Sequence, residues 1–264
     1  MRTDNVIRVA PASADDLALA ITLADAADAL TMAGYRSSDL VVHTKPDLTP
    51  VTEVDQAVER ALRDMLAVQR PLDAVIGEEY GGDSTAGRRW VIDPIDGTKN
   101  YVRGVPVWST LIALIEDTGE ITVGVVSAPA LQRRWWAATG HGAFTQGPED
   151  TEPRRIAVSE VRDLADASVS VSDPIGWPDG SLDRLHQATW RLRAYGDFWS
   201  HLLVAEGAVD IAAEPELNLW DVAALVPIVV EAGGRITSFH GQPTLDSAIT
   251  TNGHLHDAVI DLLH

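Results

Sequence analysis

Cysteine is absent from this chain of 264 residues. Its absence excludes disulfide bonds and metal sites built from thiolates, and it suits a reducing compartment, so we expect a cytoplasmic protein. Long apolar runs are missing as well: no segment approaches the ~18 uninterrupted apolar residues that are typical of a membrane-spanning helix. The N-terminus leads into no apolar signal core, and no membrane association is expected.

Basic residues are scarce: 20 Lys and Arg stand against 39 Asp and Glu, which gives a formal net charge of −19. Nucleic acid is not an expected partner, because phosphate backbones bind clustered Lys and Arg. Most of the acidic excess is typical of a solvated surface that aids solubility. Some of the carboxylates are candidates for holding divalent cations, which would also reverse the local charge for a small anionic substrate.

Hydrophobic residues make up 45% of the chain, enough for a large core in one domain or in two closely associated halves. Their periodicity predicts helices over residues 14–34 and 52–69, then strands over 74–77, 90–92, 107–115, 121–127 and 134–138. This pattern favours an α+β first half with an antiparallel sheet.

The polar segment 146–153 interrupts the periodicity and is the expected boundary between the halves. Beyond it, short strands and helices alternate over residues 167–171, 182–189, 192–194, 198–206, 209–213, 219–232, 248–251 and 254–263. Such alternation is typical of an α/β arrangement. We therefore predict a single unit with an α+β half over residues 1–147 and an α/β half over residues 148–264.

Two carboxylates, Asp93 and Asp96, follow the short apolar strand Trp-Val-Ile. A turn can use Asp-Gly for its backbone preference, but it does not need a second Asp at the strand end. Carboxylates suit hard cations such as Mg²⁺, and the free N–H groups of Gly97 and Thr98 suit a phosphate. Together they predict metal-assisted phosphoryl chemistry.

Three further acids are candidates for the same site, and each also has a purely structural interpretation. Asp55 and Asp221 can be first-turn helix residues that follow the capping residues Thr52 and Asn218. Glu78 can be an ordinary loop acid. However, it directly follows a buried strand, where an uncompensated charge is costly.

The Asp-x-Asp-Gly-Thr element of haloacid-dehalogenase-type phosphatases is a rival interpretation of this segment. In that element the first Asp is the nucleophile. Here the residue two positions before Asp96 is Pro94, and Asp93 is one residue out of register. A phospho-aspartate route is therefore rejected.

Several segments together resemble the inositol monophosphatase superfamily of Mg²⁺-dependent, lithium-sensitive phosphatases. The matching segments are residues 77–79 (Gly-Glu-Glu), 93–98 (Asp-Pro-Ile-Asp-Gly-Thr), 220–224 (Trp-Asp-Val-Ala-Ala), 231–234 (Glu-Ala-Gly-Gly), Lys45 and residues 51–55. The resemblance covers nearly the whole chain. It implies a layered α-β-α-β-α sandwich with the metal site between the halves, and a homodimer.

The resemblance also implies a set of metal ligands. Glu78, Asp93 and the backbone carbonyl of Ile95 would hold a first Mg²⁺. Asp93 would bridge to a second Mg²⁺ held by Asp96 and Asp221, and a third, weaker ion would lie near Glu78. Two or three Mg²⁺ ions per site are thus expected, and two of them can stabilise the attacking and leaving oxygens of an in-line displacement.

Roles around the substrate follow from the same resemblance. The Thr98 hydroxyl and Glu78 would orient a metal-activated water, with Asp55 accepting a hydrogen bond from Thr98. The N–H groups of Gly97 and Thr98 would bind phosphate oxygens. Lys45 would add positive charge nearby, although it can equally be a solvated loop lysine.

The substrate pocket is expected in the second half. Glu214 matches the family's polyol-binding Glu, whereas Asp197 stands in a segment, 193–198, where the family has small residues. A second acid close to Glu214 favours a cationic substrate, but Asp197 can instead cap the helix that starts at Phe198. The aromatic residues Trp108, Tyr195 and Trp199 are either apolar pocket walls or core.

Residues 100–108, 127–136 and 195–198 resemble the actinobacterial type of histidinol-phosphate phosphatase. The expected reaction is Mg²⁺-dependent hydrolysis of L-histidinol phosphate to L-histidinol and phosphate in histidine biosynthesis. Two acids suit the ammonium and imidazole of histidinol. The alternative is an inositol-1-phosphate or broad-specificity sugar-phosphate phosphatase. A bisphosphate nucleotidase is less favoured, because no basic pocket is evident, and a non-enzymatic metal-binding protein is disfavoured by the complete ligand set.

Overall fold

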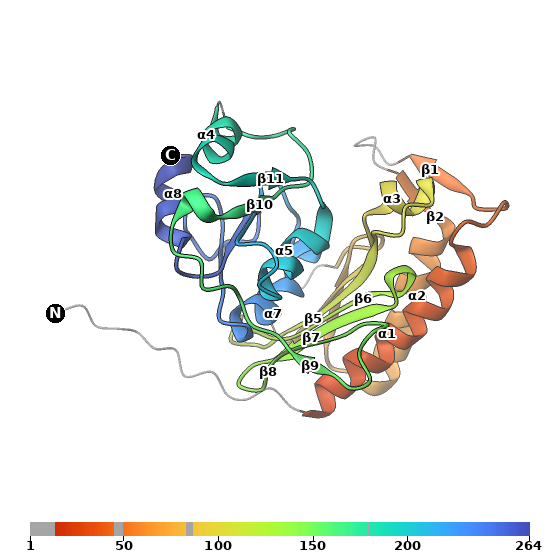
Figure 1. Ribbon diagram of the computed structural model, residues 1–264. Helices are drawn as coiled ribbons and strands as arrows, with labels where there is room; N and C mark the ends of the chain where they lie inside the picture. The colour runs from red at the N-terminus through yellow and green to blue at the C-terminus, as the bar shows by residue number, and fades with distance from the viewer. Residues whose placement is uncertain (1–13, 45–49, 83–86, 179) are drawn as a thin grey trace.

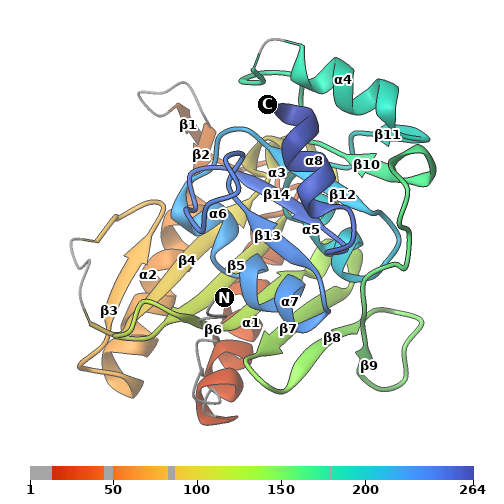
Figure 2. The same ribbon diagram turned by 90° about the vertical axis from the view of Figure 1, so that its left-hand side faces the viewer.

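The protein folds into five alternating layers of helices and sheets (Figures 1 and 2). The computed structural model describes residues 14–44, 50–82, 87–178 and 180–264. The α-β-α-β-α sandwich implied by the sequence motifs is confirmed.

A seven-stranded sheet forms the larger of the two β layers. Its strands lie in chain order: β3 (Ala74–Gly77), β4 (Arg89–Asp96), β5 (Ser109–Ile115), β6 (Ile121–Ala128), β7 (Arg133–Ala138), β8 (Gly142–Gln146) and β9 (Arg154–Arg155). Only β3 and β4 pair in parallel, so their carboxyl ends meet at one edge. Every residue of β5 is buried, because helices cover both faces of the sheet. The sheet continues through β9, beyond residue 147.

Two long helices, α1 (Ala14–Gly34) and α2 (Glu53–Gln69), cover one face of this sheet as the periodicity predicts. Helix α1 is the one helix among the described residues that is long and apolar enough to cross a membrane by length and composition alone. Its Leu23 and Ala27 are fully buried in a core cluster with Leu62 of α2 and Ile112 of β5. The apolar face of α1 is thereby used in packing against the sheet.

The middle layer contains α5 (Asp197–Ala205), α6 (Leu219–Val222) and α7 (Leu225–Glu231). Helix α7 packs on β6, β7 and β8, whereas α5 contacts both sheets through the core. The prediction of one helix over residues 219–232 is wrong, because the chain breaks between α6 and α7. Pro227 explains the break: it has no N–H for the carbonyl of Ala223, and its ring crowds that carbonyl.

The second sheet has the strand order β11 (Arg191–Arg193), β10 (Ser168–Ser170), β12 (Ile211–Glu214), β14 (Ala248–Thr251) and β13 (Arg235–Thr237). Strands β11, β10 and β12 run parallel, so their carboxyl ends also share an edge. Helices α4 (Ser181–Ala188) and α8 (His256–Leu263) form the outermost layer. Small elements complete the fold: β1 (Val42–Thr44), β2 (Pro50–Thr52), α3 (Thr98–Arg103) and the 3₁₀ turns at Pro129–Leu131 and Leu164–Asp166.

Candidate active site

Asp93 and Asp96 lie at the carboxyl end of β4, and Glu78 follows the parallel neighbour β3. The pairing of β4 with β5 shifts register between Asp93 and Asp96. This irregularity bends the strand so that two carboxylates three positions apart face the same space. Asp93 is 2% exposed, and its Oδ1 accepts a hydrogen bond of 3.0 Å from the N–H of Ile95.

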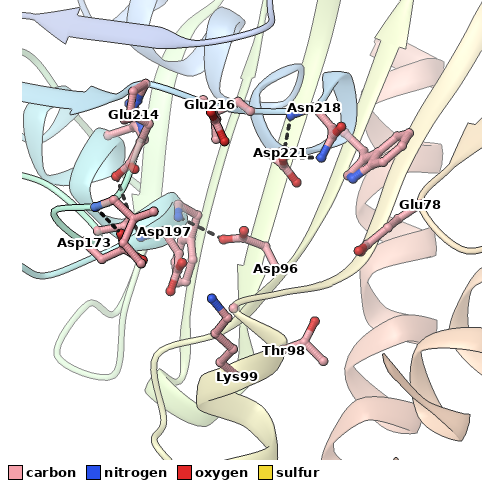
Figure 3. Close-up of a pocket in the computed structure, with 18 of the residues that line it drawn as sticks. Glu78, Asp96, Thr98, Lys99, Asp173, Asp197, Glu214, Glu216, Asn218 and Asp221 are labelled. Carbon is pink, nitrogen blue, oxygen red and sulfur yellow. Dashed lines mark hydrogen bonds between the residues drawn. The ribbon is translucent and has the colours of Figure 1, made fainter. Parts of the chain in front are cut away.

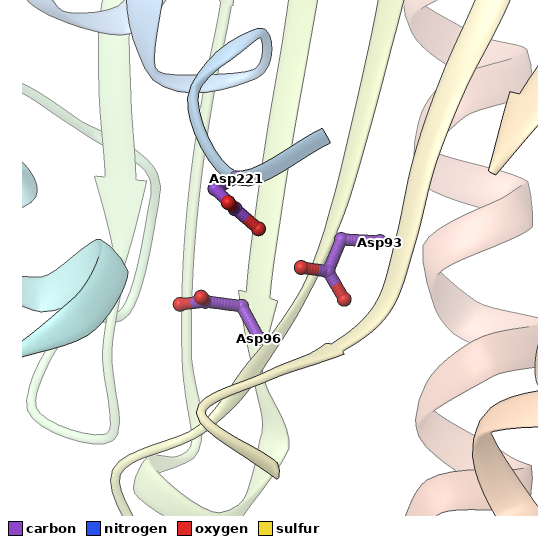
Figure 4. Close-up of side chains that lie close together, drawn as sticks. All are labelled: Asp93, Asp96 and Asp221. Carbon is purple, nitrogen blue, oxygen red and sulfur yellow. The ribbon is translucent and has the colours of Figure 1, made fainter. Parts of the chain in front are cut away.

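Asp221 of α6 completes an acidic cluster with these two residues (Figure 4). Asp93, Asp96 and Asp221 each offer one carboxylate oxygen, and these oxygens lie within 4.8 Å of one another. Two of these carboxylates come from the first half and one from the second. The cluster could therefore hold a metal ion at the junction of the halves.

The electrostatics of this cluster are those of unneutralised like charges. Burial, followed by the nearby charges of Glu78, Asp96 and Asp221, raises the pKa of Asp93 well above its usual range. Burial and the charges of Asp197 and Asp221 do the same to the pKa of Asp96. The pKa of Asp221 rises to about 6, chiefly through burial. A hard divalent cation would remove this repulsion, and an all-oxygen donor set is what Mg²⁺ prefers, so the residues present fit such an ion.

Asp55 and Asp221 are both held by helix capping boxes, as their structural interpretation predicts. Oδ2 of Asp221 accepts a 2.6 Å hydrogen bond from the N–H of Asn218. Oδ2 of Asp55 accepts from both the N–H and the hydroxyl of Thr52, at 2.8 and 2.5 Å. In both caps the acceptor is Oδ2 of the aspartate, so Oδ1 of each carboxylate is not used for capping.

The expected hydrogen bond from Thr98 to Asp55 is not among the contacts of the described residues. The Thr98 hydroxyl donates instead to the carbonyl oxygen of Ile95 at 2.9 Å, and the Thr52 hydroxyl occupies Oδ2 of Asp55. Oδ1 of Asp55 is buried with no hydrogen-bond partner in the described part of the chain. Burial raises the pKa of Asp55 to about 7, and the charges of Glu79 and Glu78 contribute to this rise.

A cavity of about 690 Å³ opens beside the acidic cluster (Figure 3). Seven predicted site residues line it: Glu78, Asp96, Gly97, Thr98, Asp197, Glu214 and Asp221. Asp93, Ile95 and Asp55 are buried, and none of them is a lining residue. Lys45 lies outside the described residues. The backbone of Gly97 is left-handed, with φ of 80°, and starts α3, so that Gly97 and Thr98 lie at the cavity.

The far side of the cavity carries acids from the ends of the parallel strands in the second sheet. Glu214 ends β12, and Asp197 follows β11 by a short turn. Ser172, after β10, joins them: its hydroxyl donates to Oε1 of Glu214 and accepts 2.7 Å from the N–H of Asp197. Figure 3 shows Asp197 and Glu214 on one side, Glu78 on the other, and Asp96 and Asp221 between them.

The helix-cap interpretation of Asp197 is wrong. The N-cap of α5 is Gly196, and no side chain caps this helix by a hydrogen bond. Oδ2 of Asp197 accepts instead from the side-chain amide of Asn100 at 3.1 Å. Burial raises the pKa of Asp197, and the charge of Lys99 opposes the rise. Burial raises the pKa of Glu214 to about 7 as well.

Sequence reasoning missed Ser172, Asp173, Lys99 and Trp220, all of which line the cavity. Ser172 and Asp173 lie just beyond the carboxyl end of β10, after Val171, and that position was the available signal. None of the three aromatic residues considered as pocket walls, Trp108, Tyr195 and Trp199, lines the cavity. Trp108 is fully buried against Tyr35 and Tyr101, with ring centroids 5.2 and 4.9 Å away. Tyr195 and Trp199 pack on each other and are not lining residues.

Comparison with known proteins gives consistent matches along almost the full length. The model of the inositol monophosphatase family matches residues 14–264. A histidinol-phosphatase of Mycobacterium tuberculosis is 56% identical over 259 residues, covering 96% of this chain and 99% of its own. A histidinol-phosphatase of Streptomyces coelicolor is 56% identical over 260 residues, covering 95% and 97%. A solved Thermotoga maritima IMPase is 34% identical, has a TM-score of 0.84, and is matched over 94% of this chain and 96% of its own.

Proposed function

The chain belongs to the inositol monophosphatase family, and we propose that within it the protein is a Mg²⁺-dependent histidinol-phosphatase. It would hydrolyse L-histidinol phosphate to L-histidinol and phosphate, a step of histidine biosynthesis. The observation that carries the proposal is the arrangement of the carboxylates that line the cavity. The cavity places the carboxylates of Asp197 and Glu214 opposite Glu78, with Asp96 and Asp221 of the acidic cluster between them. The 56% identity to two histidinol-phosphatases supports it.

At the phosphate end, we propose that Glu78, Asp93, the carbonyl of Ile95, Asp96 and Asp221 hold two or three Mg²⁺ ions. Bound there, these ions would neutralise the phosphate and acidify a water molecule. The contacts support this assignment in one respect: Asp221 accepts from the backbone with Oδ2 and Asp93 with Oδ1, and the carboxyl of Asp93 also lies within hydrogen-bond reach of Glu78.

Around the phosphate, the chain contributes donors and an orienting group. The N–H groups of Gly97 and Thr98 stand at the left-handed turn before α3 and would bind phosphate oxygens. The Thr98 hydroxyl now bonds to Ile95, so it would have to turn toward the nucleophilic water, which Glu78 would orient from the opposite side. Asp55 is buried behind the cavity lining, and its carboxyl interacts electrostatically with Glu78 and Glu79.

At the leaving-group end, Asp197 and Glu214 would bind the ammonium group and the imidazole of histidinol. A charge-assisted hydrogen bond from an ammonium to a carboxylate is about twice as strong as a neutral one. It also restores the ionised form of Glu214, whose pKa burial has raised to about 7. An ester with a neutral leaving group offers no such compensation, and we therefore expect weaker binding of that ester.

An inositol-1-phosphate or broad sugar-phosphate phosphatase is the second candidate. The presence of Glu214 favours it, because a carboxylate also accepts hydrogen bonds from polyol hydroxyls. This alternative function gives no reason for the second carboxylate, Asp197.

Cytoplasmic residence and a homodimer remain predictions and form part of the proposal.

Phosphate release from L-histidinol phosphate tests the proposal. Purified protein should release equimolar L-histidinol and phosphate with Mg²⁺, and a chelator should abolish the release reversibly. Asp93→Asn should be inactive under the same conditions, and Asp183→Asn on exposed α4 is the matched control. Undiminished release in the presence of the chelator, or none from any small ester with Mg²⁺, would rule the function out.

A further inference from the structure

We propose that Glu59 of α2 is a positioning residue that sets the affinity of the metal site. Its buried carboxylate holds the turn over residues 77–82, which carries Glu78. The inference rests on the proposed function in one respect, namely that Glu78 is a metal ligand. Glu59 itself touches neither metal nor substrate in this account.

The carboxylate of Glu59 takes up the backbone donors that follow Glu78. Glu59 is 0% exposed. Its Oε2 accepts a 2.7 Å hydrogen bond from the N–H of Glu79, and its Oε1 accepts one of 3.2 Å from the N–H of Tyr80. Two consecutive N–H groups aimed at one carboxylate fix the backbone orientation of the turn.

Arg63, one helical turn further along α2, completes the arrangement. Its Nε donates to Oε1 of Glu59 at 2.8 Å, which compensates the buried charge. Its terminal nitrogens donate to the carbonyl of Val75 at 3.2 Å and to the carbonyl of Gly81. Arg63 thus binds the strand before Glu78 and the end of the turn after it, while Glu59 binds the middle.

Gly77 shows how closely the turn and Glu59 approach each other. A Cβ at this position would lie 2.1 Å from Oε1 of Glu59, so any larger residue would have to displace the Glu59 carboxylate. The N–H of Gly77 bonds to the carbonyl of Gly81 at 3.0 Å and closes the turn. The N–H of Glu78 bonds to Ile92 of β4 at 3.2 Å, which ties the turn to the strand that carries Asp93.

A purely structural role is the alternative for Glu59, and it makes a different prediction. Removing one partner of a buried ion pair destabilises a fold, because it leaves the other charge uncompensated. If Glu59 only filled space or stabilised α2, its loss would lower the unfolding temperature and leave metal affinity unchanged. Groups that orient metal ligands behave differently, because their loss typically costs about 10–100-fold in metal affinity.

The test compares Mg²⁺ binding by calorimetry in wild type, Glu59→Gln and Asp16→Asn. The Gln side chain has the same shape, but its amide presents a donor where two backbone donors and Arg63 now converge. In Glu59→Gln we expect Mg²⁺ binding to weaken roughly tenfold or more, and the amide protons of Glu79 and Tyr80 to exchange faster.

Asp16 is the matched control, because it is also a buried acid that pairs with arginines. It is 4% exposed and bonds to Arg70 and Arg88, far along the chain from Glu78. Its loss should leave Mg²⁺ affinity unchanged.

A second variant keeps the test decisive if Glu59→Gln does not fold. Arg63→Lys keeps a positive charge beside the buried Glu59 carboxylate, but a single ammonium cannot reproduce the forked contacts to Val75 and Gly81. The Arg63 side chain is 26% exposed, so folding should survive. This variant should weaken Mg²⁺ binding in the same direction. Wild-type affinity in the folded variants, or equal loss in Asp16→Asn, overturns the inference. If wild type itself binds no Mg²⁺, the proposed function fails instead.

Discussion

The backbone N–H of Phe198 donates a 2.9 Å hydrogen bond to Oδ2 of Asp96. Asp96 ends β4 in the first sheet, and Phe198 belongs to α5 between the sheets. This bond ties a residue of the acidic cluster to the helix that begins with Asp197. The position of Asp197 relative to the acidic cluster is therefore constrained by direct contact between the two halves.

Asp93→Asn should stabilise the metal-free protein and abolish its response to Mg²⁺. The substitution removes one charge from a buried cluster whose members repel each other, while Oδ1 can still accept from Ile95. We expect the melting temperature at pH 8 in chelator to rise by about 2–4 °C, corresponding to ~1 kcal/mol. Scanning fluorimetry with and without Mg²⁺ measures both effects. An equal Mg²⁺-induced shift in wild type and variant would contradict the assignment of Asp93 as a ligand.

Asp197→Asn should change substrate preference more than overall activity. The variant keeps an acceptor for Asn100 but loses the negative charge beside Glu214. Loss of one charge-assisted hydrogen bond predicts roughly a tenfold or greater fall in kcat/KM for histidinol phosphate, since such bonds contribute about 1.5–3 kcal/mol. Turnover of a phosphate ester with a neutral leaving group should change little. A similar fall for both esters would instead indicate that Asp197 supports the metal site through Phe198.

Glu214→Gln should alter the pH dependence of stability in the ligand-free protein. The pKa of Glu214 rises from its ordinary value of 4.5 to about 7, chiefly through burial. The stability associated with its protonated form is fully present below pH 4.5 and is lost as the pH rises through 7. Relative to wild type, Glu214→Gln should thus gain on the order of 3 kcal/mol between about pH 4.5 and 8. Urea unfolding at several pH values measures this difference, and parallel pH curves would exclude a raised pKa.

Glu231→Gln should destabilise the fold without affecting metal binding. Its two carboxylate oxygens accept from the N–H groups of Gly140 and Gly142, both at 2.7 Å, which ties α7 to the turn between β7 and β8. An amide can satisfy only one of these donors, so we expect a loss of about 1–3 kcal/mol in unfolding free energy. Mg²⁺ affinity and kcat at 25 °C should match wild type. A loss of Mg²⁺ affinity in the folded variant would place Glu231 in the metal site instead.

Local signals were sufficient to predict several elements of the first half. Helix 14–34 and strand 74–77 coincide with α1 and β3. The length of the first apolar segment favours a helix, and the shortness of the second favours a strand. The clustering of Asp93, Asp96 and Asp221 follows from motifs whose order in the chain is diagnostic of the family. The break before α7 needed attention to Pro227, whose effect outweighs the apolar periodicity around it.

The leaving-group end could not be predicted in the same way, because it is made by contacts between distant residues. Nothing near Asp197 in sequence indicates that Asn100 is its partner or that Ser172 joins it to Glu214. Trp108 was a reasonable candidate for a pocket wall, but it is fully buried in an aromatic cluster. Which aromatic side chain faces a cavity depends on packing between elements, and composition carries no information about it.

The most direct test of the account is a steady-state comparison of L-histidinol phosphate with inositol 1-phosphate at saturating Mg²⁺. The account predicts a kcat/KM at least tenfold higher for histidinol phosphate, and it predicts that Asp197→Asn removes most of this preference. A clear preference of the wild-type enzyme for inositol 1-phosphate would contradict it and would favour the polyol-phosphate alternative.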